Sequence, residues 1–96
     1  MNDLSHIKAI LVTLKPEMVA KYHVSSLGLF GSVVRDDFNP KSDVDIIVDF
    51  NRQVGVEFID LANFIESKLR IPVDLVSKKG VKDRYFKQIE QEIVYV

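Results

Sequence analysis

One apolar strand constrains this chain more than any other feature. The run from Val44 to Phe50 is apolar except at Asp45 and Asp49, which is typical of a central strand covered on both faces. Asp43 and Asp45 are separated by one residue, so on a strand they point to the same face. Asp49 shares that face, but it lies near the far end and is interpreted as a solvent-facing terminus. Carboxylates held this close repel each other unless a cation neutralises them.

A Gly-Ser turn precedes this strand and follows the apolar run 26–30. Gly31 lets the backbone turn sharply and approach a ligand closely. The N–H groups that follow it, together with the Ser32 hydroxyl, suit a phosphate oxygen. Arg35 comes one turn later and could reach the same phosphate, or it could be a surface arginine. A Gly-Ser pair alone is usually just a turn, so its weight depends on the neighbouring acids.

Asp74 is the third candidate acid. It lies in the apolar run 73–76, and if that strand pairs with 44–50, Asp74 meets Asp43 and Asp45 on one face. Three carboxylates suffice for two magnesium ions, which prefer hard oxygen ligands. The alternative is a structural role, in which Asp74 pairs with Lys78 or Arg84.

Periodicity predicts one α/β domain over residues 1–96. An apolar stripe at helical spacing lies in the first eighteen residues, and Pro16 is expected to end that helix or restart a second one. The order of elements predicts a small α/β sandwich around a short sheet. The expected elements are helices up to Pro16 and on to Tyr22, a strand over 26–30, one or two helical turns over 33–37, a strand over 44–50, a helix over 56–70, a strand over 73–76, a helix over 82–92 and an apolar tail over 93–96.

Composition excludes several classes of function. The 96 residues carry a net charge of -1, which gives no basic excess for a nucleic-acid backbone. There is no cysteine, so disulfides and thiolate chemistry are excluded, as expected for the cytoplasm. No apolar run approaches membrane-spanning length, and the N-terminus lacks the pattern of a signal peptide.

The chain resembles the minimal nucleotidyltransferases (MNT), the smallest members of the DNA polymerase β-like superfamily. Four segments carry the resemblance: 29–35, 42–50, 73–76 and the ending 91–96. The resemblance covers nearly the whole chain. It implies a small α+β nucleotidyltransferase fold with a polymerase β-like palm, in which a short mixed sheet is flanked by helices. Asp36 departs from the family pattern, which commonly has glycine there, and this acid is expected to weaken nucleotide affinity.

The resemblance also implies an activity and a partner. Such proteins are typically antitoxins that transfer AMP from Mg-ATP to a tyrosine of a HEPN-family toxin, so a hetero-oligomer is expected. On this basis Gly31, Ser32 and Arg35 would bind the triphosphate. The catalytic and metal-binding residues would be Asp43, Asp45 and Asp74, with two Mg²⁺ ions. Larger relatives carry an added domain for the acceptor, whereas here the acceptor hydroxyl is expected to come from the partner protein.

Three other interpretations remain open from the sequence. A weak or inactive site would leave an antitoxin that neutralises its toxin by binding alone, and Asp36 favours this. A transferase for a small hydroxylated substrate would need an acceptor domain. A purely structural domain would have no reason to place acids inside two apolar strands.

Overall fold

A four-stranded mixed sheet with helices on both faces forms the molecule. The computed structural model describes residues 3–35, 38–39 and 41–96. The elements are α1 (Leu4–Tyr22), β1 (Val24–Phe30), a 3-10 helix η1 (Gly31–Val33), β2 (Val44–Phe50), α2 (Val56–Leu69), β3 (Val73–Ser77), a second 3-10 helix η2 (Lys78–Gly80), α3 (Asp83–Ile89) and β4 (Val94–Tyr95). The strand order is β3-β2-β1-β4, with β2 and β3 parallel and the other two pairs antiparallel.

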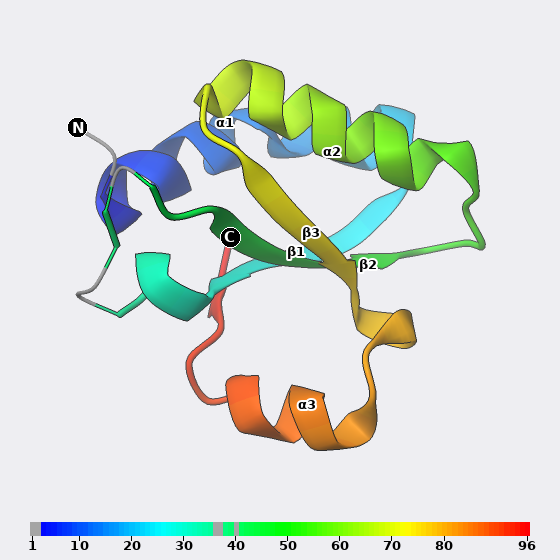
Figure 1. Ribbon diagram of the computed structural model, residues 1–96. Helices are drawn as coiled ribbons and strands as arrows, with labels where there is room; N and C mark the ends of the chain where they lie inside the picture. The colour runs from blue at the N-terminus through cyan, green and yellow to red at the C-terminus, as the bar shows by residue number, and fades with distance from the viewer. Residues whose placement is uncertain (1–2, 36–37, 40) are drawn as a thin grey trace.

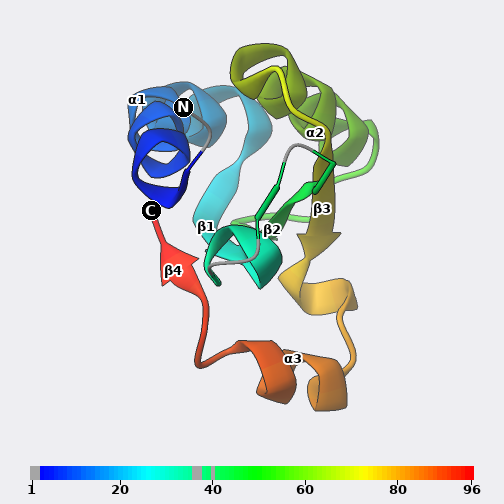
Figure 2. The ribbon, with the colours of Figure 1, turned by 60° about the vertical axis from the view of Figure 1, so that its left-hand side comes forward.

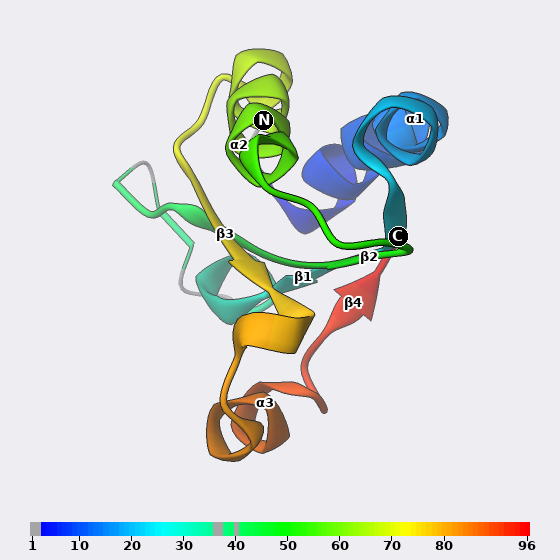
Figure 3. The ribbon, with the colours of Figure 1, turned by 90° about the vertical axis from the view of Figure 1, so that its right-hand side faces the viewer.

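The helices are divided unequally between the two faces of the sheet. Helices α1 and α2 cover one face, and α3 lies on the other (Figures 1 and 3). The predicted α+β architecture, a short mixed sheet flanked by helices, is therefore confirmed. No helix within the described ranges is long and apolar enough to cross a membrane.

Strand β2 runs through the middle of the sheet, as its apolar sequence predicts. Val44, Ile46 and Val48 are fully buried in the main core beneath α1 and α2. Ile47 points the other way and packs with Ile89 of α3 in a second, smaller cluster. Because side chains alternate along a strand, the odd-numbered positions 43, 45, 47 and 49 all belong to the α3 face.

Helix α1 corrects one expectation. Pro16 was expected to end or restart the helix, yet α1 continues through it from Leu4 to Tyr22. Pro16 is exposed, while Ile7, Leu11 and Met18 are fully buried along a single face. Packing of that face outweighs the roughly 3 kcal/mol that an interior proline costs a helix.

The chain ends as an edge strand. The apolar tail was expected to dock on the body, and it does so by pairing with β1, with Gly28 opposite Tyr95 and Leu29 opposite Val94. The backbone oxygen of Val96 also accepts a hydrogen bond of 2.7 Å from Lys15 of α1. Figure 2 shows β4 beside β1, directly after the loop that leaves α3.

Two shorter elements also differ from expectation. The segment after the Gly-Ser turn forms the 3-10 helix η1 instead of one or two α-helical turns, and positions 36 and 37 of that prediction lie outside the described residues. Helix α3 covers only Asp83–Ile89 of the predicted range 82–92. The residues after it turn back toward the sheet, which carries Glu92 to the end of β1.

Candidate active site

Strand register brings two of the predicted acids together. In the parallel β2–β3 ladder Asp45 lies directly opposite Asp74, and both belong to the α3 face of the sheet. Asp45 is half-buried, whereas Asp74 is exposed on the edge strand. The pair therefore consists of one sheltered carboxyl and one that an outside molecule can reach.

The surroundings of Asp45 disfavour its charge. Its pKa is raised from 3.8 to about 6, chiefly by burial and next by the nearby charges of Asp74 and Asp43. A hydrogen bond between the Asp45 and Asp74 side chains acts in the same direction, and the Arg35 guanidinium opposes it. Neighbouring carboxyl groups that are partly shielded from water bind a proton more tightly than isolated ones, and a cation can take the place of that proton.

This chemistry fits a hard divalent cation. Oxygen ligands from paired carboxylates are what Mg²⁺ accepts, and its charge would relieve the repulsion at Asp45. Asp43 is exposed just before β2 and acts on Asp45 through its charge. Among the described residues, no three His, Cys, Asp or Glu side chains are gathered closely enough to hold a metal. The Asp45–Asp74 pair fits the cation, and the full three-carboxylate ligand set stays a prediction.

Gly31 fits against this pair because it has no side chain. Its φ is 77°, in the left-handed region that favours glycine. A Cβ atom built there would overlap the Asp45 carboxylate. The β1–β2 register explains the closeness, since Phe30 at the end of β1 lies opposite Asp45. The Gly-Ser turn and the carboxylate pair therefore form a single site.

Ser32 and Arg35 lie on the same segment as the turn. Ser32 is half-buried inside η1. The Arg35 backbone N–H donates to the Gly31 carbonyl at 3.1 Å, which holds the start of its side chain near the turn. The guanidinium is largely exposed. Asp36, the departure from the family pattern, lies outside the described residues.

Glu92 is a residue of the site that sequence reasoning missed. Its carboxylate accepts a 2.9 Å hydrogen bond from the Gly31 N–H, across 61 positions of sequence. It also forms a 3.3 Å ion pair with Arg35. The sequence gives only a weak signal for this role, namely that Glu92 is an acid directly before the apolar tail 93–96. The contact exists because β4 pairs with β1 and thereby places Glu92 beside the turn.

The chemistry of these groups suits a phosphate ester. A turn with backbone N–H groups and an arginine has the donors and positive charge that phosphate oxygens accept. Paired carboxylates have the oxygen ligands that a cation accepts, and an exposed carboxylate such as Asp74 has the chemistry of a proton acceptor. Such an arrangement suits displacement at phosphorus, where positioning and charge neutralisation supply most of the catalysis.

Comparison with known families agrees with this chemistry. A family model described as "Nucleotidyltransferase domain" matches residues 11–96. Protein adenylyltransferase MntA of Thermococcus cleftensis is 39% identical over 97 residues, covering 100% of this chain and 98% of its own. "Putative protein adenylyltransferase MJ0126" of Methanocaldococcus jannaschii is 37% identical over 98 residues and covers both chains completely.

Solved structures share the fold. A structure described as a "putative minimal nucleotidyltransferase" superposes with a TM-score of 0.75 at 26% identity, covering 94% of this chain and 88% of its own. The MNT antitoxin of Shewanella oneidensis, solved with a tri-AMPylated HEPN toxin, gives a TM-score of 0.69 at 20% identity, covering 95% and 69%.

The first prediction concerns the space beside Asp45. Gly31→Ala should lower the free energy of unfolding by about 2–4 kcal/mol, because it adds a left-handed alanine and a clash with the carboxylate. Gly55→Ala is the matched control, since a Cβ there meets nothing within 4 Å. Urea denaturation of both variants checks this. Equal stability of the two variants would contradict the geometry of the turn.

The second prediction concerns Glu92. Glu92→Ala removes the acceptor of the Gly31 N–H and should cost about 1 kcal/mol in the free energy of unfolding. Glu92→Gln keeps a side-chain oxygen for that bond, so it should retain most of the stability. Exposed Glu90 gives the control variant Glu90→Ala. A loss in Glu92→Gln as large as in Glu92→Ala would assign the effect to the Arg35 ion pair instead.

The third prediction follows from the raised pKa of Asp45. Its contribution to stability is fully present below about pH 4 and is lost as pH rises through about 6, because the folded state disfavours the ionised carboxyl. In a chelating buffer, Asp45→Asn should therefore be more stable than the wild type at pH 8, by about 1–2 kcal/mol after allowance for solvent screening. The difference should shrink toward pH 4.

Thermal melts across this range test the pH dependence. Asp49→Asn is the control, because Asp49 lies on the same face of β2 but four residues from the pair. Addition of Mg²⁺ at pH 8 should raise the melting temperature of the wild type and leave Asp45→Asn unaffected. A pH-independent difference between wild type and Asp45→Asn would show that Asp45 ionises normally.

Proposed function

The chain belongs to the minimal nucleotidyltransferases, and from that premise we propose that it is the antitoxin of a HEPN-family toxin. It uses Mg-ATP to transfer AMP to the hydroxyl of a tyrosine on that toxin. The observation that carries the proposal is the pairing of Asp45 with Asp74 directly beside the positive-φ turn at Gly31. Relatives that match the full chain are named protein adenylyltransferases, and an MNT of the same fold has been solved with an AMPylated HEPN toxin.

We assign the nucleotide to the turn and the cation to the acids. Gly31, Ser32 and Arg35 would bind the β- and γ-phosphates, with Asp43 and Asp45 as the ligands of one Mg²⁺ ion. Asp74 would complete the site for a second ion. When bound, the metal neutralises the carboxylates and the triphosphate and polarises the phosphoryl oxygens.

The transfer reaction itself exchanges one bond at phosphorus. The acceptor oxygen forms a bond to the α-phosphorus of ATP, the bond from that phosphorus to the bridging oxygen breaks, and pyrophosphate leaves. Asp74 takes the proton of the attacking hydroxyl, since it is an exposed carboxylate opposite Asp45. Half-buried Asp45 and the turn hold the reacting phosphate in place.

The edge position of Asp74 supports an acceptor that is a protein. Strand β3 is an edge strand of the sheet and Asp74 is exposed on its α3 face, so a side chain of a second protein can approach it. A HEPN toxin as that protein is part of the proposal, on the strength of the structural relatives.

One observation favours a second candidate function. Glu92 already occupies the Gly31 N–H and pairs with Arg35, which are two of the groups assigned to the triphosphate. The Glu92 carboxylate would compete with the triphosphate for these groups and would lower the affinity for the nucleotide. The chain would then be a weak or inactive enzyme that neutralises its toxin by binding.

The fourth prediction separates these two functions. The protein encoded beside this chain is co-expressed with it and incubated with ATP and Mg²⁺, and its intact mass is measured. We expect a gain of whole AMP units, reduced at least 100-fold in rate by Asp45→Asn or Asp43→Asn because the cation loses a ligand. Asp49→Asn, on the same strand and face, should transfer AMP normally.

The outcomes are distinct. An unchanged mass in a tight complex would support neutralisation by contact alone. Normal transfer by a folded Asp43→Asn/Asp45→Asn double variant would exclude these residues from the site.

A further inference from the structure

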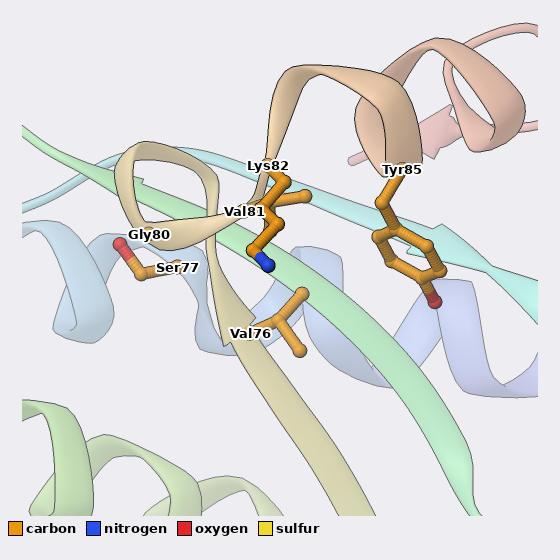
Figure 4. Close-up of a pocket in the computed structure, with 6 residues that line it drawn as sticks. All are labelled: Val76, Ser77, Gly80, Val81, Lys82 and Tyr85. Carbon is orange, nitrogen blue, oxygen red and sulfur yellow. The ribbon is translucent and has the colours of Figure 1, made fainter.

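A recess lies next to the carboxylate pair, between β3 and α3. It has a volume of about 450 Å³ and is lined by Val76, Ser77, Gly80, Val81, Lys82 and Tyr85. In Figure 4 the side chains of Val76, Lys82 and Tyr85 extend into one common space. We propose that this recess binds the purine base of the nucleotide, an inference that rests on the proposed nucleotidyl transfer.

Two features place the recess near the site. Val76 follows Asp74 by two residues on the same face of β3, which places the recess about 7 Å along the strand from that carboxylate. Tyr85 packs edge-on against Phe30, with ring centroids 6.5 Å apart. Phe30 immediately precedes Gly31 and lies opposite Asp45. Tyr85, one wall of the recess, therefore packs on the residue that adjoins both the turn and Asp45.

The direction of the reaction places the base on this side. Pyrophosphate leaves toward the turn at the end of β1, so an in-line attack enters from the opposite side, across the β3 edge. The nucleoside is attached to the α-phosphorus off that line, and one direction open to it runs along the strands. The recess lies along β3 in that direction, beyond Asp74 and not across the sheet edge.

The walls match the chemistry of a purine. Val76 and Val81 offer apolar surface to a flat ring, and Tyr85, 44% exposed, offers an aromatic face. Aromatic side chains stack on bases in many nucleotide-binding proteins. The Lys82 ammonium is a donor for the acceptor nitrogens on the edge of the base. Lys78, in contrast, lies over the Phe86 ring at 5.5 Å and is directed elsewhere.

The fifth prediction uses a ligand without a base. Binding of Mg-ATP and of Mg-tripolyphosphate to the 96-residue chain is measured by calorimetry. In the wild type ATP should bind at least tenfold more tightly than tripolyphosphate. Tyr85→Ala should raise the Kd for ATP about tenfold and leave that for tripolyphosphate unchanged. Unchanged tripolyphosphate binding also shows that the variant is folded.

Two further variants sharpen the result. Tyr95→Ala is the matched control, because Tyr95 is similarly exposed at 48% but lies on β4 at the other edge of the sheet. It should leave both affinities unchanged. Lys82→Met keeps an unbranched side chain on the exposed wall and removes the donor, so it should weaken ATP severalfold and leave tripolyphosphate unaffected.

Each outcome decides a different claim. If Tyr85→Ala retains the wild-type preference for ATP, the recess does not bind the base, and the proposed transfer stands. If Tyr85→Ala binds ATP normally but no longer modifies the partner protein, the recess contacts the acceptor and the inference is overturned. If the wild type binds neither ligand, the proposed function itself fails.

Discussion

The contact between Asp45 and Asp74 is the constraint on which the site depends. Two acids opposite each other on neighbouring strands repel, and partial burial of Asp45 adds to the cost. The sheet tolerates this because the opposite face of the same strand is fully buried, with Val44, Ile46 and Val48 packed under α1 and α2. The core thus stabilises an arrangement that the acids alone would disfavour, as is typical of functional sites.

One alternating pattern sets both the fold and the site. Because side chains on β2 alternate, the residues that build the core determine that Asp45 points to the opposite face. A slip of one residue in register would bury Asp45 among the helices and expose Ile46. This coupling explains why the sequence alone predicted strand 44–50 with its exact bounds and, on condition that this strand pairs with 73–76, the meeting of Asp45 with Asp74. Helix 56–70 was predicted to within one residue from its own apolar stripe.

Features set by distant contacts could not be predicted in the same way. The continuity of α1 through Pro16 depends on packing that no local propensity reports. The pairing of β4 with β1, the approach of Glu92 to Gly31 and the packing of Tyr85 on Phe30 each join segments far apart in the chain. Periodicity carries information on neighbours within a few turns, and these contacts lie beyond that range.

The C-terminal segment links the turn to the rest of the molecule. Strand β4 holds the end of the chain against β1, and the Lys15 bond to Val96 ties it to α1. Glu92, just before that strand, binds Gly31 and pairs with Arg35. The N–H bond is short and half-buried, whereas the pair with Arg35 is longer and exposed, so it contributes little to stability. The N–H bond alone is therefore enough for Glu92 to keep the turn in shape if Arg35 leaves this ion pair for a phosphate, so an internal anion is compatible with the proposed nucleotide site.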